Sequence, residues 1–250
     1  MKKYSYQIIG VFIIPASWLI CSDIIHLASP LLMPTLTSVL NRLNNLVCVE
    51  SINQDLIATT SRWIIGFILG SLAGIGLGLA LGVSTRLKKL LEFPLEFLRA
   101  MPVTAIFPLF LMIFGIGDSS KIAMAFMPTF LLMTINTTYG VSLSDPTRRK
   151  MARAFGANKF QIFRTIVIMD ALPQIFVGLR LTLSQSLVVI VVSEMFIGSD
   201  HGLGQRVYDS YLTNSVTTLY AFLIILGALG YFANKFLLEL EAKLIFWTGK

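Results

Sequence analysis

The chain has 250 residues, of which 55% are hydrophobic and only 13% are charged, and its mean hydropathy is +0.77. A soluble domain of this length needs more charge to cover its surface, so the composition excludes a soluble globular protein and predicts an all-α integral membrane protein. A formal net charge of +7 is large enough for a nucleic-acid-binding protein. Whether the charge reflects nucleic-acid binding or membrane topology depends on where the basic residues lie along the chain.

Six apolar segments are predicted to cross the bilayer, because a spanning helix needs about 20 apolar residues. They are 8–28, 56–83, 97–115, 121–141, 174–197 and 216–237. Lys2 and Lys3 before the first segment also fit a signal peptide, but apolar residues continue past Cys21, which favours a retained span. A polar loop, 29–55, is expected between the first two spans, and a basic loop, 84–100, after the second.

The second segment carries a glycine at every fourth position. These residues are Gly66, Gly70, Gly74, Gly78 and Gly82. Glycine at this spacing lines one ridge of a helix and lets a neighbouring helix approach closely. Glycine is also common in membrane helices in general, but five at one spacing favour a packing face.

The third segment is short and contains Pro102 and Pro108. A short span interrupted by proline is either a broken helix beside a transport pathway or an ordinary kinked helix, and the residues alone leave both open.

In the fifth segment, Thr182, Ser186 and Ser193 share one helical face, which ends at Glu194. A charge inside a span needs a partner or a wet cavity, so Glu194 is a candidate functional residue. The alternative is that it lies at the outer interface and binds loop backbone. Arg62, inside the second span, is expected either to reach the interface or to pair.

The longest polar island separates the fourth and fifth spans, from Asp145 onward. Asp145 can cap a helix that has Pro146 in its first turn, and a second short helix can begin near Asn158. Gly156 lies between them and permits a sharp change of direction. This helix–glycine–helix segment has no core of its own, so it is expected to be held by a partner.

Lysine and arginine distribution orients the chain. Fifteen of the twenty lie at the two termini, in 84–100 or in the polar island, whereas only Arg42, Lys121 and Arg206 lie in the opposite loops. Both termini and the island are therefore predicted to be cytoplasmic. The basic charge reflects topology, and we expect no nucleic-acid partner.

Catalytic and cofactor motifs are missing from the sequence. It has no G-x-x-x-x-G-K-[ST], G-x-S-x-G or H-E-x-x-H run, and its two histidines and two cysteines show no metal-ligand or disulfide spacing. We therefore expect no enzyme activity, no metal and no cofactor in this chain.

Several short runs occur in a fixed order along the chain. They are Arg99-Ala100-Met101-Pro102, Pro108-Leu109, Phe114-Gly115-Ile116-Gly117, Lys121, Gly178-Leu179-Arg180, Ser193-Glu194-Met195 and Gly202-Leu203-Gly204. Together with Ala152, Ala154, Gly156, Ala157 and Leu172-Pro173 of the island, they resemble the ABC importer permeases, in the branch that includes nitrate, sulfonate, taurine and bicarbonate permeases. The island is similar to that family's EAA loop, and the likeness covers about residues 56–240.

Three positions depart from the family pattern. Lys150 stands where the motif has its leading glutamate, Met151 replaces the next alanine, and Met169, which is followed by Asp170, replaces a common proline. The glutamate helps hold the loop in relatives, so those contacts are not carried over, while the helix–glycine–helix form is kept.

The resemblance implies a type I ABC importer permease fold of the bacterial cytoplasmic (inner) membrane. It divides the chain into an N-terminal span with an outer loop (1–55), a permease core (56–240) with a coupling helix at about 146–163, and a tail (241–250). It implies an ATPase dimer that carries ATP and magnesium, a second and identical permease chain, and an external substrate-binding protein. The implied ATPase contact is Met151, Ala152, Arg153, Ala154, Phe155, Gly156 and Ala157.

The transported solute is left open by the sequence. The resemblance favours a small anion, with a thiamine-precursor-like heterocycle as the alternative. The candidate pathway residues are Met101, Asn136, Thr182, Ser186 and Glu194. Two other classes compete: an ion-coupled secondary transporter, which needs more buried ionisable groups than this chain offers, and a non-transport membrane scaffold.

Overall fold

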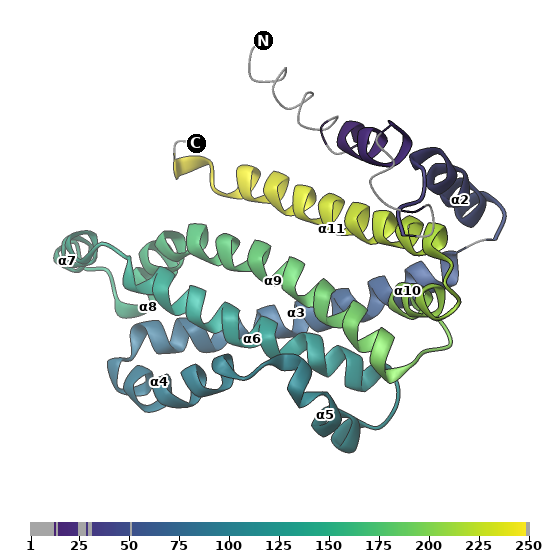
Figure 1. Cartoon of the computed structure of the whole chain (residues 1–250). Helices are drawn as coiled ribbons and strands as arrows, with labels where there is room; N and C mark the ends of the chain where they lie inside the picture. Colours follow the sequence, from purple (N-terminus) through teal and green to yellow (C-terminus); the bar gives the residue numbers. More distant parts are fainter. Residues whose placement is uncertain (1–12, 14, 25–28, 30–31, 51, 249–250) are drawn as a thin grey trace, which may run out of the picture.

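A computed structural model describes residues 13, 15–24, 29, 32–50 and 52–248, and within these residues every regular element is a helix. Four helices run side by side along the molecule: α3 (Asn53–Val83), α6 (Asp118–Ser142), α9 (Ile168–Ile197) and α11 (Val216–Leu244) (Figure 1). Their apolar side chains meet in a core where α3, α6 and α9 converge, around Trp63, Ala125 and Ile190. The all-helical membrane fold predicted from composition is confirmed.

Four helices in the described residues are long and apolar enough to cross a membrane: Asn53–Val83, Asp118–Ser142, Lys159–Ile197 and Val216–Leu244. The count rises to five if the bent pair described below forms one span. Of the first predicted span, 8–28, the structure describes residues 13 and 15–24, which are helical and end in the π-helical turn Ile20–Ile24. The total of six spans therefore stays a prediction.

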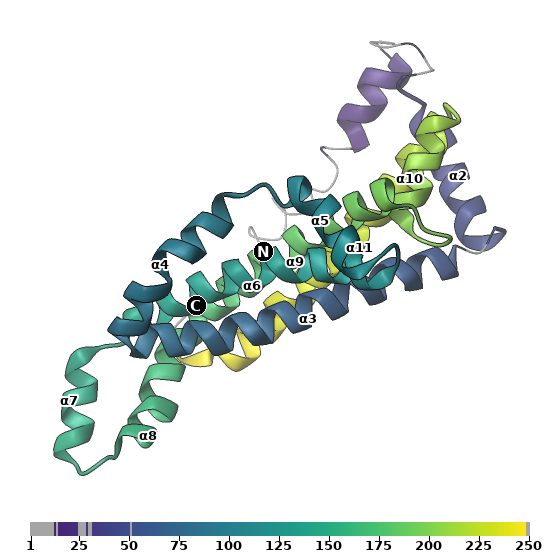
Figure 2. The same ribbon diagram turned by 90° about the horizontal axis from the view of Figure 1, so that it is seen from below.

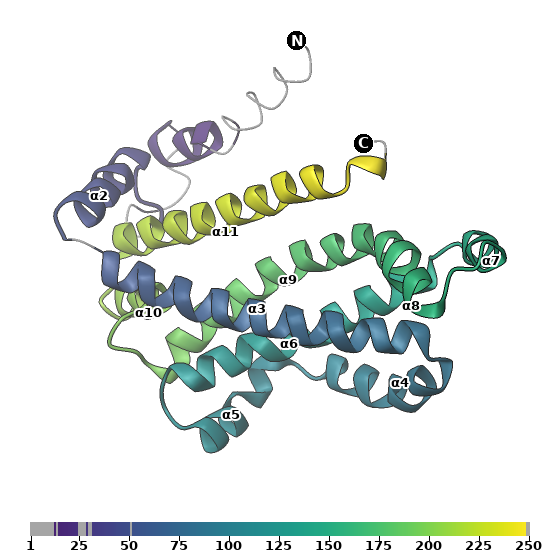
Figure 3. The ribbon, with the colours of Figure 1, turned by 180° about the vertical axis from the view of Figure 1, so that it is seen from behind.

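The glycine ridge of α3 faces α6 along its whole length (Figure 3). A β-carbon added at Gly66, Gly70, Gly74, Gly78 or Gly82 would lie 2.4–2.8 Å from atoms of α6. Gly76, which lies off this repeat, has nothing within 4 Å of such a carbon. The close approach of two backbones, rather than chance composition, accounts for the spacing.

The third predicted span is wrong as a single helix. The chain forms α4 (Thr85–Ala100) and a helical segment Val103–Phe114, which bend by 89° at Met101-Pro102. The segment includes α5 (Phe107–Phe114), which is about 12 Å long and too short to cross a bilayer alone. The break lies at Pro102, because Pro108 falls in the first turn of α5 where proline is tolerated. The broken-helix alternative is the one observed.

Two predicted loops are helical. The basic loop 84–100 is α4, capped by the Ser84 side chain, which accepts from the Leu87 N–H. The polar loop 29–55 contains α2 (Leu36–Cys48), which packs against α11 through the buried Val39 and Leu46. Both segments contain apolar residues at helical spacing, but many polar residues lie between them, and for this reason both were predicted as loops.

The remaining helices are short and lie at the two ends of the bundle. At one end α7 (Pro146–Ala154) and α8 (Lys159–Ile162) form a projection, and a π-helical turn (Phe163–Val167) joins α8 to α9. Because α9 continues this helix, its start near 174 was predicted too late. At the opposite end α10 (Leu203–Leu212) lies beside α2 and α11 (Figure 2). A terminal turn, Phe246–Thr248, follows α11.

Candidate functional site

The segment Asp145–Ile162, which we call the elbow, projects beyond the end of the bundle (Figure 2). The Asp145 carboxylate accepts a hydrogen bond from the Thr147 N–H at 2.7 Å and caps α7, as predicted. This backbone hydrogen bond holds the pKa of the Asp145 carboxyl below its ordinary value. Gly156 has φ +86°, a left-handed conformation that favours glycine, and it makes the predicted bend.

The second helix of the elbow has a reciprocal cap. The Asn158 side chain accepts from the Gln161 N–H, and the Gln161 side chain accepts from the Asn158 N–H, each at 2.8 Å. This capping box explains why α8 begins where the sequence predicted.

Apolar side chains of the elbow point into open space. Phe155 is 86% exposed, Phe160 68% and Met151 56%, and no residue of α7 is buried. Ala152 and Ala157 lie half-buried across the bend, where the Ala157 N–H donates to the Ala152 carbonyl at 3.0 Å; Arg153 and Ala154 are exposed. A rigid, basic projection that exposes large apolar groups has the properties of a docking element.

An ion pair fastens the elbow to the bundle. Arg148 contacts Asp170 of α9 at 2.8 Å, and the Ser144 hydroxyl donates to the same carboxylate at 3.0 Å. Asp170 follows Met169, which stands at the position of the family's common proline, and Lys150, at the position of the motif glutamate, is exposed. The acidic anchor of this elbow therefore comes from α9.

The opposite end of the bundle is held by buried charges. Glu194 is fully buried and forms an ion pair with Arg62 at 2.6 Å. Arg62 also contacts Asp118 at 2.7 Å and donates to the His201 carbonyl at 2.8 Å. Arg62 therefore pairs, one of its two predicted outcomes, and it links α3, α6 and α9.

The same charges bind the N-terminus of α10. The N–H groups of Gly202, Leu203 and Gly204 donate to Asp55, Thr59 and Glu194, at 2.9, 2.8 and 2.9 Å. These are groups that a helix leaves without internal partners. We call Asp55, Thr59, Arg62 and Glu194 the α10 clamp. Glu194 thus binds backbone at this end of the bundle, which corresponds to the second of its two expected roles, that of binding loop backbone.

The candidate pathway residues separate into two groups. Thr182 and Ser186 are fully buried, where their hydroxyls donate to carbonyls of their own helix and Ser186 accepts from Trp63. Glu194 is enclosed in the clamp. Met101 lies partly exposed at the break after α4, and Asn136 is partly exposed and accepts from Gln174 at 3.2 Å.

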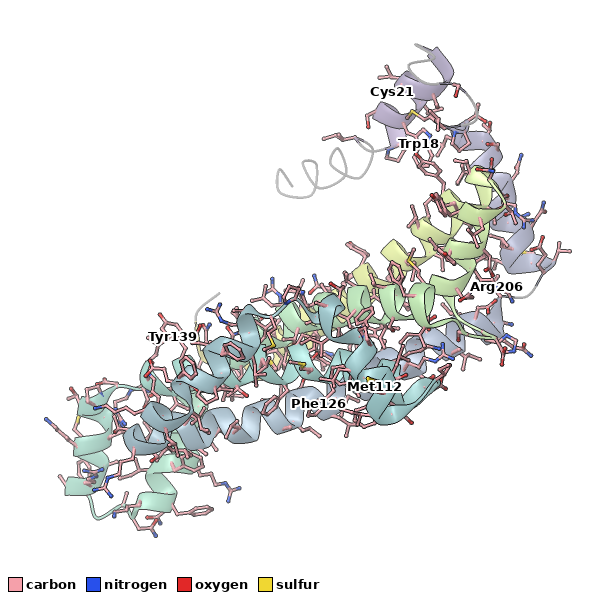
Figure 4. The ribbon with its side chains drawn as sticks, turned by 60° about the horizontal axis from the view of Figure 1, so that its bottom comes forward. Trp18, Cys21, Met112, Phe126, Tyr139 and Arg206 are labelled. Carbon is pink, nitrogen blue, oxygen red and sulfur yellow. The ribbon has the colours of Figure 1, made fainter. Side chains whose placement is uncertain are left out.

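One face of α9 that the sequence pattern does not reveal is left uncovered by other helices. Leu181, Ser184, Gln185 and Val188 are all exposed, on the side opposite the buried hydroxyls. Among the described residues, the Ser184 and Gln185 side chains have no hydrogen-bond partner. The buried hydroxyls and the exposed residues of α9 both recur at helical spacing, so spacing alone does not distinguish the buried face of the helix from the exposed one. Figure 4 gives the orientation of the bundle, with Arg206 of α10 at one end and Tyr139 of α6 toward the elbow.

Known proteins resemble this chain over most of its length. Residues 66–243 match the family described as binding-protein-dependent transport system inner membrane component. The chain is 30% identical over 218 residues to a probable ABC transporter permease protein of Brucella abortus (strain 2308), with 87% of each chain covered. It is 28% identical over 250 residues to a putative aliphatic sulfonates transport permease protein of Bacillus subtilis (strain 168), covering 99% of this chain and 90% of that one.

A solved structure shares the fold. A chain of the MetNI methionine ABC transporter, in an inward facing conformation, matches with a TM-score of 0.63 and 21% identity over 72% of this chain and 91% of that chain. The expected type I ABC permease fold is confirmed. The chain belongs to the family of binding-protein-dependent transport system inner membrane components, the membrane-embedded permeases of ABC importers.

Proposed function

We propose that this chain forms, with a second copy of itself, the translocation pathway of an ATP-driven importer for a small oxyanion-bearing solute, with an organosulfonate as the first candidate. The main support for this proposal is the projecting elbow, because its exposed apolar side chains are accessible for binding by an ATPase partner. The proposed location is the bacterial cytoplasmic membrane, with the elbow on the cytoplasmic side.

The energy source lies on another polypeptide in this proposal. The sequence has no phosphate-binding loop, so ATP and magnesium would bind to a partner ATPase dimer. The contact would be Met151 to Ala157, with Phe155 as the apolar knob and Gly156 as the bend. Arg148 and Asp170 would transmit the partner's motion from α7 to α9, since they join the elbow to the long helix.

The other proposed partners, a second copy of the chain and a binding protein, would bind to surfaces that are uncovered in one protomer. The broken pair α4–α5 and the uncovered face of α9 are the surfaces that a second copy would complete into a closed pathway. A binding protein would deliver solute at the α10 end, in keeping with the family's description. The Bacillus subtilis relative, a putative aliphatic sulfonates transport permease protein, is the reason that an organosulfonate is the first candidate.

The test is reconstitution with the partner ATPase and binding protein in vesicles. ATP-dependent uptake of taurine or another anion is expected. Gly156→Asp should abolish ATPase co-purification and uptake without affecting membrane insertion, since it places a side chain at a left-handed bend within the docking surface.

Gly115→Asp is the matched control. Gly115 also has a left-handed φ, +73°, and open space around it, but it lies at the turn between α5 and α6, away from the elbow. This variant should retain the ATPase. Full transport by Gly156→Asp, or uptake that a protonophore abolishes while ATP is intact, would overturn the proposal.

A further inference from the structure

A cavity of about 470 Å³ opens between α9 and α11, which lie side by side in Figures 1 and 3. Four polar side chains line it: Arg180, Ser184 and Gln185 of α9, and Asn234 of α11. The other lining groups are aliphatic residues of α9. Both α9 and α11 are long enough to span a membrane, so we expect these polar groups to lie within the spans or at their edge.

Arg180 has unused hydrogen-bonding capacity. Its hydrogen bond within the described residues joins Nη1 to Glu241 at 3.3 Å, which is longer than the 2.7–2.9 Å typical of a charge-assisted bond. Its Nε is buried without a partner. A guanidinium presents five donors in a planar fork, and the Arg180 side chain is 37% exposed, so the Nη donors that do not bind Glu241 are available to a ligand.

The three neutral groups are also unpartnered. Ser184, Gln185 and Asn234 make no side-chain hydrogen bond within the described residues. Polar groups left without partners in hydrocarbon are costly, and they persist where they face water, a ligand or another chain. Gln185 also shares a helical face with Gln174, eleven residues and about 16 Å along the axis, so the polar groups form a track rather than a single point.

The chemistry of the cavity selects an anion. Among the residues that the structure describes, no carboxylate lines the cavity, and all four polar side chains can donate hydrogen bonds. A guanidinium fork matches two oxygens of a sulfonate, nitrate or carboxylate, and the hydroxyl and amides can reach further oxygens. Because the contact between Arg180 and Glu241 is long, an arriving oxyanion would displace the Glu241 carboxylate from the guanidinium. The contact would form again when the oxyanion leaves. Binding of this kind is weak enough for passage.

We propose that Arg180, Ser184, Gln185 and Asn234 form an oxyanion subsite on the translocation path, which takes the charged group of the transported solute. This inference rests on the proposed function and adds to it the residues that contact the substrate. A lipid phosphate has similar chemistry, so the test separates the two sources.

The experiment measures equilibrium binding of radiolabelled taurine and nitrate to the purified permease–ATPase complex in detergent. Wild type is expected to bind at least one of these probes. Arg180→Gln and Gln185→Leu should each weaken binding about tenfold or more, because each removes hydrogen bonds to a charged ligand. Arg180→Lys should bind with intermediate affinity, since it keeps the charge but loses the fork.

Ser184→Ala should also weaken binding, because it removes a donor from the subsite. Its matched control is Ser61→Ala, since Ser61 is an exposed serine on α3 whose hydroxyl donates to a carbonyl of its own helix. It should bind as wild type does. Native mass spectrometry of the same samples reports bound phosphatidylglycerol. The subsite is refuted if wild type binds neither anion, if the cavity variants bind normally, or if they lose lipid and keep anion affinity. ATPase co-purification, which depends on the elbow, tests the proposed function separately.

Discussion

Replacing Glu194 with glutamine should destabilise the α10 end of the bundle. Glu194 is fully buried and neutralises Arg62, whose side chain is only 8% exposed. Removing one partner of a buried ion pair costs about 3–5 kcal/mol, because the other charge is left uncompensated. Asp118 still contacts Arg62 after the change, and its side chain is 62% exposed, so the lower end of this range is expected.

The assay is thermal unfolding of the purified permease in detergent, followed by tryptophan fluorescence in a chain whose Trp18 and Trp247 are replaced by phenylalanine, so that Trp63 is the emitter. This tryptophan neighbours Arg62 in sequence and is 1% exposed, so its emission reports on the clamp region. The matched control is Glu50→Gln, which breaks an exposed pair with Arg42 and should cost at most about 1 kcal/mol.

A double variant tests the cause. Arg62→Met combined with Glu194→Leu removes both charges and should recover part of the lost stability, since similar replacements of buried pairs are often neutral. If Glu194→Gln unfolds at the same temperature as Glu50→Gln, the pair contributes no stability and the clamp reasoning is wrong.

Three further outcomes are expected. Gly74→Ala should destabilise by about 1–3 kcal/mol through collision with α6, whereas Gly76→Ala should be neutral or slightly stabilising; both are measured as thermal midpoints. Thr59→Val should cost about 1–3 kcal/mol, because the Leu203 N–H and the Glu194 carboxylate both lose a partner, and an unchanged midpoint would contradict this. Asp145→Ala should expose the elbow to trypsin faster than Asp145→Asn, which keeps a capping oxygen. Because the pKa of Asp145 is lowered, the cap is fully present above the ordinary value of about 4 and is lost only as the pH falls through the lowered pKa, so tryptic rates should show no cap-related change near neutral pH.

Local signals predicted the elbow well. Asp145 and Pro146 fix a helix start, and Gly156 fixes the bend, because each acts on its own backbone and immediate neighbours. The glycine ridge could also be predicted, because its spacing is visible within one helix and does not depend on the sequence of the helix that packs against it.

Properties that depend on distant contacts could not be predicted. The stripe of Thr182 and Ser186 has the same helical spacing as that of Leu181 and Gln185, and only the packing of α3 and α6 decides which is buried. The pairing of Arg62 with Glu194 joins residues 132 positions apart, and hydropathy gives no information about such a contact. Helices α2 and α4 were missed because their apolar residues are too few for a membrane span.

The most direct test of the proposed energy coupling is the protection of a cysteine at position 155. Phe155→Cys, in a chain whose Cys21 and Cys48 are replaced by serine, is treated with a membrane-impermeant maleimide in inside-out vesicles, with and without the ATPase. Labelling without the ATPase and protection with it are predicted, while Leu90→Cys, 71% exposed on α4 in the stretch predicted to be cytoplasmic, should be labelled equally with and without the ATPase. Labelling of Phe155→Cys only in right-side-out vesicles, or equal labelling with and without bound ATPase, would contradict the account.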